Sequence, residues 1–362
     1  MLAARAYEGE TELRLEEIER PVAGTGEVVI EVVSAGLAPG VLAQWERGMY
    51  PILPRTLGNE AAGTIAELGE GVTGLAVGDR VRLHPNLSCR ACDYCLTDRE
   101  QMCSAHSIIG QGLYGPEAMP LYTRYHHGGL AEFVLAPSWA VDPLPDAISF
   151  DVAAKVHDVA DALRAWKVAA PPPGATVVFT AATGTVGTAA VRMARFFGVR
   201  RLIAVARSSE RLQQVRDLDP DLVETVAFDE LGDDWGEQRA LTGAIRAKAP
   251  GGVDAVIDFL PEGPGTWQAV AALRTGGTAV LMGSNTIMPP LPTIAVMVNC
   301  WRIAGTRGCT REDARQVLRW LEDGVLDVED LITHRFELSD IAAATRTVRE
   351  RSEPTWMVVV HP

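Results

Sequence analysis

The stretch Thr176–Ala194, TVVFTAATGTVGTAAVRMA, joins a strand pattern to a helix pattern through a turn of small residues. Gly184 and Gly187 permit a close approach of the backbone, and the free N–H groups of a helix N-terminus favour a pyrophosphate. The first glycine of a G-x-G-x-x-G pattern is missing, since Ala182 stands two residues before Gly184. The position after a strand and before a helix still favours a phosphate loop over a plain turn. We therefore predict cofactor contacts from Gly184, Thr185, Val186 and Gly187.

An alternation of strand and helix patterns surrounds this stretch, beginning after the PPPG turn at 171–174. Helical patterns such as VGTAAVRMARFFG and GEQRALTGAIRAK separate the strands. Alternating β and α segments indicate an α/β domain with a doubly wound parallel sheet, and six strands suit a Rossmann dinucleotide fold. The predicted strands are Thr176–Thr180, Leu202–Ala206, Thr225–Phe228, Asp254–Leu260, Thr278–Gly283 and Trp301–Thr306.

The end of the second predicted strand, in RLIAVARSSERL, distinguishes the two nicotinamide dinucleotides. An NAD site usually carries an acidic residue there, which binds the ribose 2′-hydroxyl. Here Ala206 takes that place, and Arg207, Ser208 and Arg211 follow. Guanidinium and hydroxyl donors hold a 2′-phosphate, so we predict NADPH; the alternative is that these are solvated surface residues. Further cofactor contacts are expected at the ends of later strands, from Leu260, Gly283 and Ser284.

The overall composition limits the class of protein. The chain has 362 residues, 47% hydrophobic and 22% charged, which is typical of a globular protein with room for two domains. Its net charge of −14 argues against nucleic acid as a partner. No run is long and apolar enough to span a membrane, and the N-terminus has no signal-peptide pattern. We expect a cytoplasmic protein with a small-molecule substrate.

The first part of the chain has a different pattern of residues. From Glu27 to about Leu83, short valine-rich segments alternate with glycine turns, which is an all-β pattern. It is followed by SCRACDYCLTDREQMC, Ser88–Cys103, in which four cysteines have the spacing C-x₂-C-x₂-C-x₇-C. Cytosolic thiols stay reduced, so the cluster favours a metal over disulfides. Cys300 and Cys309 are expected to be buried or idle thiols.

Taken together, these features resemble the medium-chain dehydrogenase/reductase superfamily, and its zinc-type alcohol dehydrogenase branch above all. VVSAGL, LGNEAAGTIAELGEGVTGLAVGDRV, the cysteine loop, GTVG and ITHRFELSDIAAA all fall in family order. The resemblance implies a GroES-like catalytic domain from residues 1–150 and 309–362, with the Rossmann domain, 151–308, inserted between them. It implies homodimers, with tetramers as the alternative. It also implies one structural zinc, whose tetrahedron four thiolates close, on Cys89, Cys92, Cys95 and Cys103.

Family members that oxidise alcohols carry a second, catalytic zinc, and here the sequence departs from the pattern. In GLAPGV, Ala38 replaces the first cysteine ligand, and Gly40 replaces the hydroxyl residue that relays a proton. In LGNEAAG, Asn59 replaces the histidine ligand, while Glu60 remains. Alanine has no donor atom, and a neutral amide is a poor zinc ligand.

The last ligand of the catalytic zinc falls in the helical pattern AKVHDVADALRAW. Counting back from PPPG places it at His157, with Asp158 as a rival one residue away. His157 and Glu60 supply two donors where a catalytic zinc prefers three protein ligands, and Asp158 is a doubtful third. We therefore expect the catalytic metal to be absent.

The leading hypothesis is an NADPH-dependent oxidoreductase that transfers hydride without a catalytic zinc to an activated C=C, C=N or carbonyl group. Asn59 is expected to act as a hydrogen-bond donor to developing negative charge, and His157 as a proton donor. Glu60 completes the predicted catalytic set. The alternatives are purely structural roles. Asn59 would form a hydrogen bond within its own loop, and His157 would be a hydrogen-bonded residue of its helix. Glu60 would form an ion pair with an arginine.

Two rival functions remain open. One is an alcohol dehydrogenase with a rearranged zinc site, and the other is a non-catalytic protein that binds NADPH. The substrate pocket is expected to involve Trp45, Tyr50 and residues near Met288 and Met297. The loop His126–Gly129 is a further candidate for substrate contact.

Overall fold

The computed structural model describes residues 1–362 and divides into two compact units. The first unit comprises Met1–Ala160 and Gly308–Pro362, and the second comprises Asp161–Arg307. The division falls within the long helix α3, Phe150–Ala169. None of the helices has both the length and the apolar character that crossing a membrane requires.

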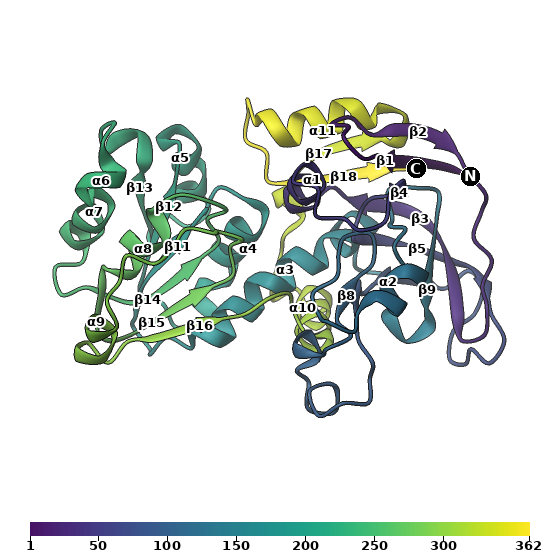
Figure 1. Cartoon of the computed structure of the whole chain (residues 1–362), viewed down its shortest axis with the longest axis horizontal. Coiled ribbons are helices and arrows are strands. Elements are labelled where there is room, and N and C mark those ends of the chain that lie inside the picture. Colours follow the sequence, from purple (N-terminus) through teal and green to yellow (C-terminus); the bar gives the residue numbers. More distant parts are fainter. The chain divides into compact units, whose positions relative to one another are not determined.

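The second unit is built on a six-stranded sheet in the order β13-β12-β11-β14-β15-β16. All five neighbouring pairs run parallel. This is the doubly wound Rossmann order, with the reversal of strand order between β11 and β14, so the predicted α/β fold is confirmed. The strands, shown in Figure 1, are β11 (Thr176–Thr180), β12 (Arg201–Ala206), β13 (Val223–Ala227), β14 (Val253–Asp258), β15 (Leu273–Leu281) and β16 (Arg302–Gly305).

Continuous apolar runs explain why these strands lie at the centre of the unit. Every residue of β11 is buried, as are five of the six residues of β12. Strands of a parallel sheet that is covered on both faces read as uninterrupted Val/Ile/Ala runs, not as alternating ones. The connecting helices are α4 (Thr185–Met193), α5 (Ser209–Asp217), α6 (Trp235–Gln238), α7 (Ala240–Lys248), α8 (Gly265–Val270) and α9 (Thr293–Val298).

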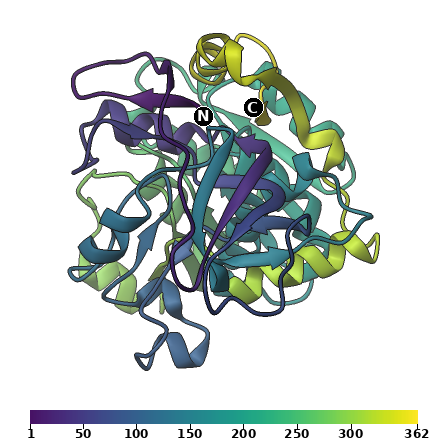
Figure 2. The ribbon, with the colours of Figure 1, turned by 90° about the vertical axis from the view of Figure 1, so that its right-hand side faces the viewer.

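The first unit contains a seven-stranded, mainly antiparallel sheet, in which the chain's two ends meet. Five strands come from the N-terminal part: β3 (Glu27–Gly36), β5 (Glu60–Leu68), β6 (Arg80–Leu83), β9 (Phe133–Pro137) and β10 (Val141–Pro143). The C-terminal strands β17 (Ile332–Glu337) and β18 (Met357–His361) complete it, and β18 pairs with β3 through Val360 and Ala35. Both termini accordingly lie in this unit (Figures 1 and 2).

Smaller elements surround this sheet. Apolar residues of both chain segments, such as Ile30, Ile65 and Val358, share one core, so the C-terminal segment folds as part of this unit. The remaining strands form a three-stranded and a two-stranded sheet: β1 (Leu2–Ala6), β2 (Arg14–Glu17) and β4 (Arg55–Thr56), with β7 (Asn86–Leu87) and β8 (Ser107–Ile108). The further helices of the first unit are α1 (Pro39–Glu46), α2 (Met119–Arg124), α10 (Arg311–Glu322) and α11 (Ile341–Glu350).

Candidate functional site

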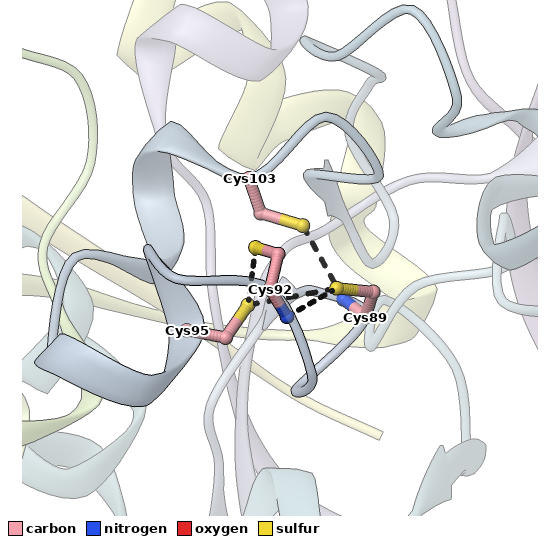
Figure 3. A group of neighbouring side chains, drawn as sticks. All are labelled: Cys89, Cys92, Cys95 and Cys103. Atoms are coloured by element: carbon pink, nitrogen blue, oxygen red, sulfur yellow. Dashed lines mark hydrogen bonds between the residues drawn. The ribbon is translucent and has the colours of Figure 1, made fainter.

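The four-cysteine loop of the first unit brings its thiols to a common centre, as Figure 3 shows. The four sulfur atoms lie within 4.8 Å of one another. The Sγ–Sγ distances are 3.5 Å between Cys92 and Cys95 and 3.9 Å between Cys89 and Cys95. A tetrahedral Zn²⁺ with Zn–S bonds of about 2.3 Å separates its sulfurs by about 3.8 Å. The cluster therefore fits a structural zinc, and its closed set of four ligands leaves no position for a substrate.

Backbone N–H groups donate hydrogen bonds to two of these sulfurs, Cys89 Sγ and Cys103 Sγ. The N–H groups of Ala91 and Cys92 donate to Cys89 Sγ at 3.5 and 3.3 Å. That of Ala105 donates to Cys103 Sγ at 3.3 Å. The Ala91 bond is the main cause that lowers the pKa of Cys89 to about 6. Metal ligands must be deprotonated, so the bonds to Cys89 favour metal binding, whereas burial raises the pKa of Cys95 and raises that of Cys103 to about 12.

The phosphate loop of the second unit connects β11 to α4. Gly184 is the N-cap of α4, so the first N–H groups of the helix have no partner within it. A Cβ on Gly187 would lie 2.6 Å from the Cα of Ala182, which means that only glycine lets the helix approach the loop this closely. Ala181 adopts a left-handed conformation with φ 52°. It directly precedes Ala182, which stands at the position of the missing first glycine. The strained turn of the motif is therefore present, on an alanine.

The predicted contacts on the later strands lie at the carboxyl end of the same sheet. The N–H groups of Met282 and Gly283 both donate to the carbonyl of Asp258, at 2.9 Å. A Cβ on Gly283 would overlap the Leu260 carbonyl, so these two loop segments pack directly on each other. Leu260 is buried and Ser284 is exposed. The carboxyl ends of the strands next to the switch point are where doubly wound sheets bind ligands.

The end of β12 presents two cations without acidic partners. Arg207 is exposed, Arg211 is half-buried, and neither forms an ion pair in the structure. Ser208 caps α5 by accepting a hydrogen bond from the N–H of Arg211 at 3.3 Å. The nearest acid, Asp229, instead accepts from the N–H and hydroxyl of Ser209 at 3.0 and 3.2 Å. Both guanidinium groups are therefore free to bind an anion.

The predicted catalytic residues Asn59 and Glu60 lie at the start of β5, which pairs with the end of β3. Gly36 is paired with Glu60 in the sheet, and Ala38 follows at the N-cap of α1. Asn59 directly precedes β5 and is only 3% exposed. Its Oδ1 atom is buried and has no hydrogen-bond partner, so the loop hydrogen bond considered above is not formed by this atom. A buried amide oxygen without a partner needs an explanation, and binding of a ligand supplies one.

Sequence reasoning missed the residue that contacts Glu60. Lys155, on α3, is fully buried, and its ammonium group forms ion pairs with Glu60 and with Asp158, the latter at 2.7 Å. Burial alone lowers the pKa of Lys155, but the Asp158 and Glu60 carboxylates outweigh it, so the pKa is raised and the group stays charged. Burial and the Asp158 carboxylate raise the pKa of Glu60. A lysine three residues before an aspartate, in an otherwise apolar helix pattern, was the available signal.

His157 lies beside Cys309, one of the two thiols that the sequence predicts to be buried or idle, and Cys309 is buried. Its Nδ1 atom lies 3.4 Å from Cys309 Sγ, and both residues are buried. Burial lowers the pKa of His157 to about 4, so the imidazole is neutral at pH 7. A neutral imidazole is a hydrogen-bonding group or a metal ligand, and it is a weaker proton donor than the sequence suggested.

The remaining candidates for substrate contact are dispersed. Trp45 and Tyr50 line a cavity of about 200 Å³ in the first unit, and their polar atoms donate to backbone carbonyls. His126 and His127 line a separate open groove of about 860 Å³. His127 Nδ1 accepts a hydrogen bond from the backbone N–H of residue 56, which gives it a structural role. Met288 and Met297 are exposed on the second unit.

Comparisons with known proteins agree with this architecture. The sequence model of the alcohol dehydrogenase GroES-like domain matches residues 24–146, and that of the zinc-binding dehydrogenase family matches residues 185–323. An alcohol dehydrogenase from Geobacillus stearothermophilus is 30% identical over 90% of this chain and 90% of its own length. A probable D-xylulose reductase A from Aspergillus fumigatus is 29% identical over 89% of this chain and 86% of its own.

Solved structures give the same result. An NAD-dependent alcohol dehydrogenase superposes with a TM-score of 0.83 at 26% identity, covering 100% of both chains. A thermostable alcohol dehydrogenase from Pyrobaculum aerophilum, with bound cobalt and zinc, has a TM-score of 0.82 at 26% identity over 100% of this chain and 99% of its own. The chain belongs to the zinc-type alcohol dehydrogenase-like branch of the medium-chain dehydrogenase/reductase superfamily, a family of oxidoreductases.

Proposed function

We propose that the protein is an NADPH-dependent reductase that transfers hydride to an activated C=C, C=N or carbonyl group without a catalytic zinc. The observation that carries the proposal is the buried side-chain amide of Asn59, whose Oδ1 has no partner, at the position of a family zinc ligand. An amide in that place offers hydrogen bonds to a substrate where other members of the family offer a metal.

The residues of the family's catalytic metal position do not fit a zinc ion. Ala38 has no donor atom, Asn59 is a neutral amide, and the carboxylate of Glu60 is engaged by the ammonium of Lys155. Of the residues aligned with the three ligands, only His157 is a good zinc ligand. The four-cysteine loop, by contrast, fits the structural zinc, which would stabilise that loop and take no part in hydride transfer.

The proposed chemistry suits substrates that need little activation. A Lewis-acid metal stabilises a developing alkoxide by several kcal/mol, and each ~1.4 kcal/mol is a factor of ten in rate. One well-aimed hydrogen-bond donor supplies about 2.7–4 kcal/mol, which compensates for part of that loss. An iminium carbon already carries positive charge, and a conjugated C=C spreads negative charge to a distant oxygen. Asn59 Nδ2 would donate to that oxygen, while its buried Oδ1 would accept a hydrogen bond from the bound ligand. His157 would hold the substrate with a neutral imidazole.

The preference for NADPH rests on the end of β12. A 2′-phosphate bears negative charge, and Arg207 and Arg211 have no carboxylate partner to lose on binding it. Charge-assisted hydrogen bonds between guanidinium and phosphate are among the strongest in proteins. The pyrophosphate would bind to the N-terminus of α4 at Gly184.

Two measurements on the purified chain test this proposal. Enals, imines and ketones are offered with NADPH and with NADH, and zinc is counted by elemental analysis. We expect NADPH-dependent turnover of at least one activated acceptor with one zinc ion per chain. NADPH binding without turnover of any acceptor would instead support a non-catalytic nucleotide-binding protein.

One observation favours a second candidate, an alcohol dehydrogenase with a rearranged zinc site. His157 and Cys309 place an imidazole and a thiol 3.4 Å apart, and Asp161 lies one turn beyond His157 on α3. This candidate predicts two zinc ions per chain, the second of which is lost when Cys309 is replaced. It also predicts oxidation of simple alcohols.

We further propose a cytoplasmic homodimer joined through the second unit. β16 is an edge strand of the sheet, and α9 exposes Ile294, Met297 and Val298. An open edge beside exposed apolar side chains favours association with a second copy. The four thiols of the metal loop need a reducing compartment to remain available. Light scattering of the purified protein distinguishes dimer, tetramer and monomer.

A further inference from the structure

A buried cation lies between two carboxylates of the first unit. Lys155 is 0% exposed, and its Nζ atom contacts one oxygen of Glu60 and, at 2.7 Å, one oxygen of Asp158. Glu60 belongs to β5, whereas Lys155 and Asp158 lie one turn apart on α3. Two carboxylates from different elements therefore converge on a single nitrogen atom.

This convergence is fixed by the surrounding backbone. A Cβ on Gly36, which pairs with Glu60 in the sheet, would collide with the Glu60 carboxylate, so glycine is what admits the side chain. The second oxygen of Glu60, Oε1, is buried and has no hydrogen-bond partner. The site therefore contains one hydrogen-bond acceptor, Glu60 Oε1, that the ammonium group of Lys155 does not use. Buried carboxylates with no cation between them are costly, because desolvation and mutual repulsion both oppose their charges.

We propose that the ammonium group of Lys155 takes the place of a metal ion between Glu60 and Asp158, and so keeps a second metal ion out of the first unit. The proposal rests on the proposed zinc-free function and names the group responsible for it. Asn59 directly precedes Glu60, and His157 directly precedes Asp158, so the lysine lies among the residues aligned with the family's ligands.

Removal of the ammonium would leave a set of donors suited to a divalent cation. Glu60 and Asp158 offer two carboxylates that already contact one nitrogen atom, and water molecules would complete the coordination of the ion. The carboxylate oxygens already converge on one point, and Zn–O bonds of about 2.0–2.2 Å require only a modest contraction from the present contacts. A lysine-to-alanine change also vacates the volume that an ion and its water would occupy.

The test compares the metal content of four proteins after incubation with Zn²⁺ or Co²⁺ alone and removal of the excess. They are the wild type, Lys155→Ala, the charge-preserving control Lys155→Arg, and the double variant Lys155→Ala/Glu60→Gln. We expect one ion per chain in the wild type and in Lys155→Arg, two in Lys155→Ala, and one again in the double variant. The extra Co²⁺ of Lys155→Ala should add d–d absorption without a new thiolate-to-cobalt band, since its protein ligands are carboxylate oxygens.

The outcomes separate this inference from the proposed function. A second ion in the wild type that is lost in Cys309→Ala overturns the zinc-free function. One ion in a folded Lys155→Ala protein overturns the inference and leaves the function intact. If Lys155→Ala does not fold by itself, refolding is repeated with one and with three equivalents of Zn²⁺. Rescue by the additional zinc supports the inference, and no rescue overturns it.

Discussion

The Nδ1 atom of His157 lies 3.4 Å from Sγ of Cys309, although 152 positions separate the two residues in the chain. The contact joins helix α3 to the segment that leads into α10 within the first unit. A buried imidazole beside a buried thiol is either a packed polar pair or two ligands of a metal. The zinc-free function requires the first of these.

The change Cys309→Ala distinguishes the two readings. For a packed pair we expect the zinc content to stay at one ion per chain and activity to stay near that of the wild type. Stability should fall by about 1 kcal/mol, typical of the loss of a small buried side chain. Elemental analysis and thermal unfolding measure both quantities. A fall from two zinc ions to one, together with lost activity, would establish the rearranged zinc site instead.

Replacement of Asn59 tests the hydrogen bond that is proposed to stabilise the developing charge. Removing one such donor typically lowers kcat by about 10²–10³. We expect Asn59→Ala to show a loss of this size in kcat, and Asn59→Asp to show an equal or larger one, because a carboxylate repels negative charge. Steady-state kinetics at saturating NADPH measure it. The affinity for NADPH serves as the control and should not change, and an unaltered kcat in Asn59→Ala would contradict the assigned role.

The metal loop should affect stability more than chemistry. Cys92→Ser removes one of four thiolates and should release the structural zinc, since metal-binding free energy is also folding free energy. We expect the zinc content to drop from one ion to nearly none and the first unit to unfold at a lower temperature. NADPH binding should persist, because the nucleotide loop lies in the second unit. Fluorescence titration with NADPH checks this, and loss of binding along with the zinc would argue against separate roles.

The sequence predicted those features whose residues are close together in the chain. Strand β11, the glycines of α4 and the four cysteines each lie within one short stretch, so spacing alone identified them. Lys155 and Glu60 are 95 positions apart, and their contact depends on how α3 packs against β5, which no local pattern encodes.

The exact ends of the strands and helices were also harder to predict than their presence. The strand β15 begins at Leu273, five positions before the predicted start at Thr278, because its pairing with β14 continues through a register shift near Val253. Likewise, a pattern of glycines predicted the phosphate loop, but not that the left-handed residue of the turn would be Ala181. Backbone strain of this kind is imposed by packing, and an alanine gives no sign of it in the sequence.

Asp258, at the end of β14, should make stability depend on pH. Its carboxylate accepts hydrogen bonds from Thr180 and Thr266 at 2.6 and 2.9 Å, yet burial raises its pKa to about 6, above the usual 3.8. A carboxyl with a raised pKa in the folded state stabilises the fold fully below the unfolded pKa, and this contribution is lost as the pH rises through the folded pKa. The window is therefore pH 4 to 6. The shift corresponds to a free-energy change of roughly 3 kcal/mol.

The neutral variant Asp258→Asn isolates this effect. The melting temperature of the variant minus that of the wild type should be more positive at pH 8 than at pH 4.5, since only the wild type has a carboxyl at position 258 that ionises between these values. Differential scanning calorimetry at both pH values provides the measurement. A difference that stays constant with pH would mean that Asp258 titrates near its ordinary pKa.

The discrimination between the two nicotinamide dinucleotides should depend on Arg207. The side chain is exposed and forms no ion pair, so Arg207→Ala removes little from the folded protein itself. A hydrogen bond to a charged group contributes about 1.5–3 kcal/mol, which corresponds to roughly a 10- to 150-fold rise in the Kd for NADPH. The Kd for NADH should change by less than threefold, because NADH has no 2′-phosphate. Arg216→Ala is the matched control, since it removes an exposed arginine from the last turn of the same helix and should change neither Kd. If Arg207→Ala weakens both dinucleotides equally, the arginine does not read the 2′-phosphate, and the preference must come from another part of the loop.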